Sequence, residues 1–180
     1  GGSCFRKDIL NLVYICESYG LHEVAQYWEN VVTINEYQEE RFVQKMLHAM
    51  FNTIAQKRIA LFGFAFKANT GDTRESPAIY VARKLIEEQA RVVITDPEAL
   101  QNAEQDLKDV SQTIVFESDP FLAAQGAHAI AIMTEWDLYK TLDYKKIFEK
   151  MEKPAFLFDG RNILDHQKIY EIGFNVYPLG

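Results

Sequence analysis

From residue 57 onward, short apolar runs alternate with helical stretches, and this alternation restricts the possible fold more than any other feature of the chain. The runs are rich in β-branched residues, and little polar character interrupts them, as strands buried on both faces require. Strands and helices that alternate in this way form a parallel sheet with helices on both sides. The sequence therefore predicts an α/β fold with a doubly wound, Rossmann-like parallel sheet, whose strands are Arg58–Phe62, Arg91–Thr95, Thr113–Phe116, His128–Met133, Ala155–Phe158 and Phe174–Tyr177.

Cap signals mark the starts of helices between these strands. Ser76 precedes Pro77, and Asp119 precedes Pro120, so a capping side chain is followed in both places by a proline that suits the first helical position. Gly126 follows the second of these helices at a position where a helix can end. We expect helices at residues 77–89, 99–108, 120–125, 143–151 and 166–171.

The first 56 residues are predicted to be helical. Ile9, Leu12 and Cys16 follow helical spacing, and Gly20 stands where a helix C-cap belongs. A second helical region spans about 22–52, with a break near Asn30 left open; if continuous, it would be about 31 residues and about 46 Å long. Its apolar surface needs another helix to cover it, which implies a subunit partner or an absent domain. We divide the chain into a helical dimerisation segment, 1–56, and an α/β domain, 57–180.

Composition excludes several classes of protein. The 180 residues suffice for one domain and an appendage, and 48% are hydrophobic, so a proper core is expected. A net charge of −7 argues against a nucleic-acid partner, and no apolar run is long enough to suggest a membrane span. Two cysteines form no disulfide framework, which favours a reduced, cytoplasmic setting. The four histidines show no metal-ligand spacing, so no metal site is expected.

The connection from Gly63 to Glu75 is much longer than the usual strand-to-helix loop of about 2–6 residues. In an open α/β sheet, loops at the carboxyl ends of the strands bind ligands. Lys67 and Arg161 each follow an apolar strand, and Arg74 lies in the same long loop as Lys67. These cations predict a crevice for a phosphate or another anion. The alternative is that they are ordinary solvated surface charges.

The turn after the first strand only loosely matches a dinucleotide-binding fingerprint. Ala65 stands where the second glycine belongs, and no third glycine follows at the right spacing. Asp96 ends the second strand, where a ribose-binding acid often lies, but Asp96-Pro97 is also common turn chemistry. A complete NAD site within this domain is therefore not favoured.

Cys4 is a candidate nucleophile because it is expected just before the first helix, in a turn preceded by glycine, with Lys7 nearby. A helix N-terminus and a neighbouring cation both favour the thiolate form. Asp8, four residues later, could orient a water molecule or accept a proton. The alternative is an inert cysteine near a helix start, as we expect Cys16 to be on its apolar helix face.

Four motifs together resemble the UDP-glucose/GDP-mannose dehydrogenase family, NAD-dependent enzymes that oxidise the C6 alcohol of a nucleotide sugar to a carboxylate. They are GGSCFRKD at 1–8, GFAFKANTGDTRES at 63–76, TEW at 134–136 and FDGR at 158–161. Their order is that of the family, and the match spans essentially the whole chain. The resemblance implies two parts of a three-part enzyme, a dimerising helical connector and a C-terminal nucleotide-sugar domain. The family's N-terminal NAD-binding domain, with its catalytic Lys and Glu, is absent from this sequence.

The resemblance also implies roles for individual residues. Cys4 would be the catalytic nucleophile, and Asp8 would assist it. The substrate-binding residues would be Gly1, Phe66, Lys67 and Arg161, and the residues that contact NAD would be Cys4, Phe5, Arg6, Lys7 and Arg74. Asn162 departs from relatives that carry a second arginine there, so the cation that contacts the nucleotide is less well defined.

The implied reaction is a two-step oxidation of UDP-glucose to UDP-glucuronate through a thiohemiacetal and a thioester on Cys4. The implied partners are this substrate and product and further copies of the chain, in a homodimer or a higher homo-oligomer. The isolated chain is expected to bind the UDP-sugar but to be inactive. Two alternatives stay open: a relative that acts on GDP-mannose or an N-acetylated UDP-sugar, and a non-catalytic module that binds nucleotide sugars or dimerises.

Overall fold

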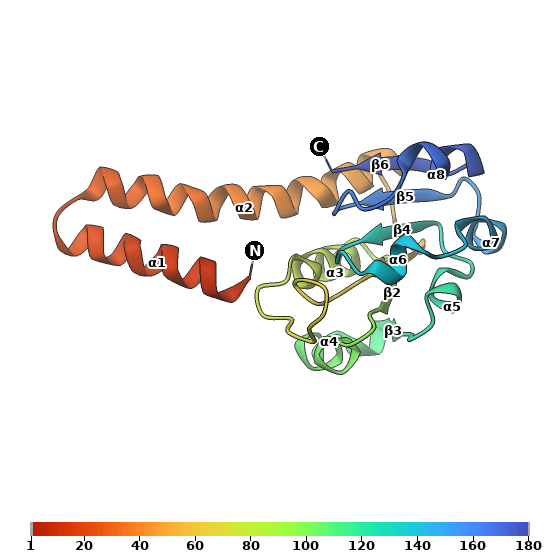
Figure 1. The fold of residues 1–180 in the computed structure, drawn as a ribbon, viewed down its shortest axis with the longest axis horizontal. Coiled ribbons are helices and arrows are strands. Elements are labelled where there is room, and N and C mark those ends of the chain that lie inside the picture. Colours follow the sequence, from red (N-terminus) through yellow and green to blue (C-terminus); the bar gives the residue numbers. More distant parts are fainter. Residues whose placement is uncertain (1, 180) are drawn as a thin grey trace.

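The computed structural model describes residues 2–179, which form a helical hairpin joined to an α/β domain (Figure 1). The hairpin consists of α1 (Ser3–Ser18) and α2 (His22–Ala49), which run antiparallel. Its tip projects away from the domain, while the start of α1 and the end of α2 lie beside the domain (Figure 1). The predicted helical segment and the predicted α/β domain are both present.

The turn between α1 and α2 follows the predicted glycine C-cap. Gly20 has a φ of 71°, and its N–H donates to the Glu17 carbonyl at 2.9 Å. The Leu21 N–H donates to the Cys16 carbonyl, also at 2.9 Å, which completes a Schellman motif. α2 is 28 residues long and passes through Asn30 without interruption, so the break that the sequence left open does not occur. No helix among residues 2–179 is long and apolar enough to cross a membrane.

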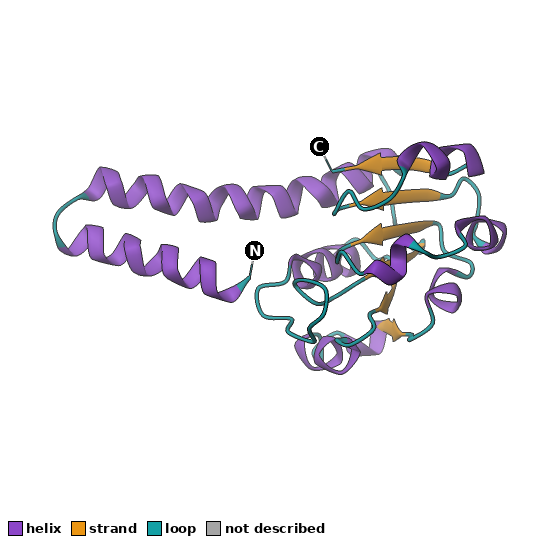
Figure 2. Ribbon diagram, viewed as in Figure 1, coloured by secondary structure: helices purple, strands orange, loops and turns teal. Residues whose placement is uncertain are grey.

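The six strands form one all-parallel sheet in the order β3-β2-β1-β4-β5-β6, as predicted for a doubly wound fold (Figure 2). The chain leaves the middle of the sheet in both directions, so the loops after β1 and β4 lie next to each other at the carboxyl edge. The first two strands match the prediction, and every end of the other four strands lies within one residue of its predicted position. The strands are β1 (Arg58–Phe62), β2 (Arg91–Thr95), β3 (Ile114–Phe116), β4 (Ala129–Ile132), β5 (Phe156–Asp159) and β6 (Asn175–Pro178).

The predicted caps begin the helices as expected. The Ser76 Oγ accepts a hydrogen bond from the Ala78 N–H, and the Asp119 carboxylate accepts one from the Phe121 N–H. The sequence did not predict the short helix α6 or the 3-10 turn η1, because neither has a full helical turn of apolar spacing. The helices of the domain are α3 (Pro77–Glu87), α4 (Leu100–Asp106), η1 (Ser111–Thr113), α5 (Pro120–Ala124), α6 (Asp137–Lys140), α7 (Tyr144–Lys150) and α8 (His166–Ile172).

Two apolar cores lie on opposite faces of the sheet. One contains side chains from α3 and α4, and the other contains side chains from α5, α6, α7 and α8. The C-terminal part of α2 also belongs to the first core, because Phe42, Val43, Met46 and Met50 are buried there. The sheet therefore covers much of the apolar surface that the sequence assigned to a missing partner. The domain boundary at residue 56 stays a prediction. α2 lies before this boundary, but its C-terminal part packs into the core of the α/β domain that follows.

Gly63 ends β1 at a place where the backbone of two strands comes close. Its φ is 97°, and a Cβ added there would lie 2.7 Å from the Thr134 backbone nitrogen. Thr134 is fixed, since its buried hydroxyl donates to the Ala65 carbonyl at 2.6 Å. Only glycine satisfies both the backbone conformation and the contact.

We expect Gly63→Ala to destabilise the fold by about 2–4 kcal/mol, because left-handed strain adds to an unrelieved clash. Gly126→Ala is the matched control: Gly126 also has a positive φ of 67°, but a Cβ there meets nothing within 4 Å. That control should lose only about 1–2 kcal/mol of strain. Urea unfolding of both variants measures the difference, and equal losses would show that the contact with Thr134 is unimportant.

Candidate functional site

A cleft of about 340 Å³ lies at the carboxyl edge of the sheet, against α2. Lys67 from the loop after β1 and Arg161 from the loop after β5 both line it, together with Phe66. Lys67 and Arg161 therefore face a common cleft, as predicted, and the anion expected there stays a prediction. Glu135, which follows β4, lines the same cleft, and α2 forms the opposite wall with Asn35, Gln38, Glu39 and Phe42.

Lys67 and Phe66 lie side by side at the start of the long loop. Lys67 is exposed, and its Nζ is 5.4 Å from the centroid of the Phe66 ring, a cation–π distance. Among the described residues Lys67 forms no ion pair. Its ammonium group is thus free to contact an anion in the cleft.

Arg161 connects three strand ends. Its Nε donates to the Met133 carbonyl at 2.7 Å, and its Nη2 donates to the Phe66 carbonyl at 3.1 Å. Glu135 forms an ion pair with Nε at 3.3 Å. These bonds fix the plane of the guanidinium group and leave Nη1 for a ligand.

Asp159 holds the loop that carries Arg161. Its side chain is fully buried, and Oδ1 accepts the Arg161 N–H at 3.1 Å. Oδ2 accepts the N–H groups of Ile163 and Leu164 at 2.9 and 3.0 Å, and His166 Nε2 lies 2.9 Å from the same oxygen. A buried carboxylate with this many donors makes the turn rigid, so Arg161 has a defined position.

Asp96 has the turn role that the sequence favoured. Its Oδ1 accepts the N–H groups of Glu98 and Ala99 at 2.9 and 2.8 Å, as in an Asx turn. Its Oδ2 accepts the N–H groups of Phe64 and Ala65 at 2.7 and 3.0 Å. Because the carboxylate is 2% exposed and saturated by donors, it does not face a ribose at this edge.

The long loop after β1 is anchored to α4 and carries a local ion pair. The Asn102 amide donates to the Gly71 carbonyl at 2.6 Å, and Thr73 hydrogen-bonds Asp106. Arg74 forks onto Asp72 with distances of 2.9 and 2.7 Å, and this pairing lowers the pKa of Asp72 to about 2. The Arg74 side chain is still 74% exposed, so it can contact a ligand on its outer side.

The start of α1 lies against this loop. Gly2 is the N-cap of α1, and a Cβ added to it would lie 3.0 Å from the Phe66 ring. Cys4 is therefore the second residue of the helix and does not precede it as predicted, and it is exposed. The Asp72 hydrogen bond is the main cause that raises the pKa of Arg74.

Arg6 and the residues after Cys4 have different surroundings. Arg6 pairs with Glu36 of α2 at 2.9 Å and with Glu75 of the long loop at 3.5 Å, so it ties three segments together. Phe5, Lys7 and Asp8 are exposed, with Asp8 one helical turn after Cys4. Gly1 was also expected to contact substrate, but it lies outside the described residues.

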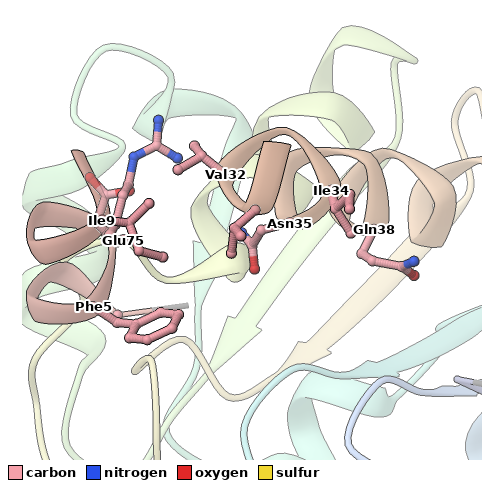
Figure 3. Close-up of a pocket in the computed structure, with 10 residues that line it drawn as sticks. Phe5, Ile9, Val32, Ile34, Asn35, Gln38 and Glu75 are labelled. Atoms are coloured by element: carbon pink, nitrogen blue, oxygen red, sulfur yellow. The ribbon is translucent and has the colours of Figure 1, made fainter. Parts of the chain in front are cut away.

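A second cavity of about 260 Å³ lies between α1 and α2 and is mainly apolar. Figure 3 shows Phe5 and Ile9 from α1 across from Val32 and Asn35 of α2, with Glu75 beside them. Asn35 and Gln38 line both this cavity and the cleft, so α2 separates the two. None of the α2 residues of the cleft was predicted as a site residue, because nothing in the local sequence indicates which face of this helix meets the sheet edge.

Comparison with known proteins agrees with this arrangement. The model of the UDP-glucose/GDP-mannose dehydrogenase family, UDP binding domain, matches residues 60–166. UDP-glucose 6-dehydrogenase 2 of Arabidopsis thaliana is 51% identical over 198 aligned residues, which cover 100% of this chain and 41% of that protein. UDP-glucose 6-dehydrogenase of Drosophila melanogaster is 50% identical over 192 residues, covering 100% of this chain and 40% of that protein.

A solved structure shows the same fold. The UDP-glucose dehydrogenase from the hyperthermophilic archaeon Pyrobaculum islandicum superposes with a TM-score of 0.79 and 32% identity. The superposition covers 99% of this chain and 37% of that one. The chain thus spans about two fifths of the length of the relatives it matches.

Proposed function

The chain belongs to the UDP-glucose/GDP-mannose dehydrogenase family, and from this premise we propose that it acts as the C-terminal part of a UDP-glucose 6-dehydrogenase. The observation that carries the proposal is the convergence of Phe66, Lys67 and Arg161 on one cleft, at the sheet edge where this class of fold binds nucleotides. The similarity to UDP-glucose enzymes over the full chain favours UDP-glucose over GDP-mannose or an N-acetylated UDP-sugar.

In this proposal the cleft holds the diphosphate of the nucleotide sugar. Lys67 supplies an exposed point charge, and Arg161 supplies a fixed fork beside it. Phe66 offers an apolar ring that also contacts the start of α1. Through this contact, substrate bound beside Phe66 would lie close to the helix turn that carries Cys4.

The proposed chemistry oxidises the C6 alcohol in two steps. NAD, bound mainly by a part of the longer protein outside this chain, supplies the hydride acceptor for each step, with Arg74 and residues 4–7 in reach of it. After the first oxidation, the Cys4 thiolate adds to the aldehyde carbon and forms a thiohemiacetal. Loss of a hydride from this carbon leaves a thioester. Water, oriented by Asp8, attacks the carbonyl, the C–S bond breaks, and UDP-glucuronate and the thiolate are released.

Two observations bear on the fit of NAD to this chain. Asp96 is occupied by backbone donors, so the domain's own sheet edge lacks the acid that would hold a ribose. Arg74 and Cys4 are both exposed, which supports contact with a cofactor held by another domain. A thiolate nucleophile also requires a reduced compartment, which supports a cytoplasmic location.

The cleft is tested by Lys67→Ala, which should weaken UDP-glucose binding by about 1.5–3 kcal/mol, the range for a charged hydrogen bond. Lys84→Ala is the control, because Lys84 is a partly exposed lysine of α3 that lies outside the cleft. Isothermal titration calorimetry on the 180-residue chain measures both affinities. If Lys67→Ala binds as tightly as the control, the phosphates do not contact this side chain.

The nucleophile is tested in the full-length protein of which this chain is proposed to be a part. Cys4→Ala should abolish formation of UDP-glucuronate and leave UDP-glucose binding nearly unchanged, because binding depends on Phe66, Lys67 and Arg161. Cys16→Ala is the control, since Cys16 is 7% exposed and faces the packing between helices. Production of the acid at near-normal rates by Cys4→Ala would show that Cys4 is structural. UDP-glucuronate itself must be measured, because the first oxidation alone also forms NADH.

We further propose that the hairpin of α1 and α2 binds a second copy of the chain. Most of the exposed large hydrophobic side chains among the described residues lie on this hairpin, counted with the turn that joins its helices. Val24, Tyr27, Ile34 and Tyr37 recur at helical spacing on the half of α2 that the sheet does not cover. An apolar stripe of this kind on a projecting hairpin is typical of a subunit interface. Its occupant would be the same stripe of the partner, related by a two-fold axis.

Sedimentation velocity at tens of micromolar should therefore show a dimer, and Tyr27→Asp should shift it to monomer, because a charge would be buried in the interface. Tyr170→Asp on α8 is the matched control: Tyr170 is 66% exposed and Tyr27 is 67% exposed. A monomeric wild-type chain, or equal behaviour of the two variants, would contradict the proposed interface.

A further inference from the structure

The cleft that holds Lys67 and Arg161 also contains two carboxylates, which is unusual for a site that binds a diphosphate. Glu135 comes from the end of β4, and Glu39 comes from α2 on the opposite wall. With two cations and two carboxylates, the side chains of the cleft have no net positive charge. A diphosphate carries two negative charges. The cleft offers a net positive charge to balance them only when one of the carboxylates is neutralised.

The two carboxylates differ in how they are compensated. Glu135 forms an ion pair with Arg161, which lies at the same edge of the sheet. Glu39 accepts a hydrogen bond from the Asn35 amide at 3.0 Å and forms no ion pair with any described residue. It is partly buried, so its charge is poorly screened by solvent.

We propose that Glu39 makes nucleotide-sugar binding depend on protons, because the cleft takes up a proton at this carboxylate when the diphosphate binds. The inference rests on the proposed nucleotide site and extends it to a residue to which no role has been assigned. The proton is taken from solvent and stays on the Glu39 carboxyl, and no covalent bond to the ligand forms.

The surroundings of Glu39 support this assignment. Burial raises the pKa of its carboxyl, and the charge of Glu36 on the same helix acts in the same direction. The Asn35 hydrogen bond and the charge of Arg6 from α1 lower it by less. On the side of α3, Glu75, Tyr80 and Arg83 line a further pocket together with Glu39. Across the cleft, the charged groups are Lys67, Arg161 and Glu135, and a bound diphosphate adds two further negative charges near the two cations. Glu39, which has no cationic partner among the described residues, is therefore the group that we expect to take up a proton when the diphosphate binds.

The direction of the pH dependence follows from linkage. If the bound diphosphate raises the pKa of Glu39 further, the complex holds more protons than the free chain at any pH between the two values. Binding then tightens as the pH falls through this window, and bound ligand in turn favours the protonated carboxyl by the same factor. Above the window, both states are deprotonated, so the affinity no longer changes with pH through this group, although its charge still weakens binding.

Isothermal titration calorimetry with UDP-glucose on the 180-residue chain tests the inference. UDP-glucose is the suitable probe because UDP has a terminal phosphate whose own second pKa, about 6, would add a pH dependence. Titrations in buffers of different ionisation enthalpy, at a series of pH values from about 5 to about 8, count the protons taken up. We expect net uptake for the wild-type chain and binding roughly three- to tenfold tighter at the lower pH.

Glu39→Gln separates this group from other titrating groups, because glutamine keeps the oxygen that accepts the Asn35 hydrogen bond and removes the charge. The variant should bind UDP-glucose roughly three- to tenfold more tightly than wild type at about pH 8, without the Glu39-linked proton uptake. Glu29→Gln on the exposed part of the same helix is the matched control and should behave as wild type. Thermal unfolding of each variant checks that the fold is unchanged.

The outcomes distinguish this inference from the proposal on which it rests. If the wild-type chain does not bind UDP-glucose, the proposed nucleotide site is wrong, and the inference is overturned with it. If it binds without proton uptake, or if Glu39→Gln takes up protons as the wild type does, the nucleotide site stands and the role of Glu39 is wrong. Tighter binding by Glu39→Gln together with lost proton linkage supports the inference.

Discussion

The buried carboxylate of Asp96 holds the carboxyl edge of the sheet together, and the geometry of the cleft depends on it. It accepts N–H groups from the turns after β1 and β2 and, at 3.1 Å, the indole Nε1–H of Trp136 after β4. A buried carboxylate without donors would be strongly unfavourable, so all three segments must be in place together. The loop that begins with Phe66 and the segment that carries Glu135 therefore start from fixed points.

The helix α2 forms the wall of the cleft opposite the sheet edge. Its C-terminal part is anchored by Phe42 and Met46 in the same core as β1 and β5, so the preceding turns have a fixed orientation over the cleft. Those turns present Asn35 and Glu39 to the site. The N-terminal half of the same helix leaves the domain and packs on α1, whose first turn returns to Phe66. One helix thus links the exposed hairpin, the proposed nucleophile and the proposed nucleotide site.

Features set by local sequence were predictable, and features set by packing between distant segments were not. The strands, the Ser76 and Asp119 caps and the glycine turn at Gly20 each depend on a few neighbouring residues, and the structure agrees with them. The cleft with Lys67 and Arg161 was also predictable, because parallel strands bring their carboxyl ends to one edge. The position of Glu39 was not, since it depends on how α2 crosses the sheet. The pairing of Arg6 and Arg74 with carboxylates likewise depends on loop conformations that no periodicity records.

The charge distribution of the cleft bears on how an acidic chain could recognise an acidic ligand. A chain with a net charge of −7 repels an anion at long range, so affinity must come from contacts made at short range. Arg161 is suited to this because Met133 and Phe66 fix its guanidinium before a ligand arrives, so little side-chain entropy is lost on binding. In our proposal, the charge of the Glu39 carboxylate on α2 then controls the affinity. The fixed cations attract a diphosphate fully only when this carboxylate is neutral. In such a site, selectivity depends on the geometry of a few held cations and on one proton, and the overall charge of the protein contributes little.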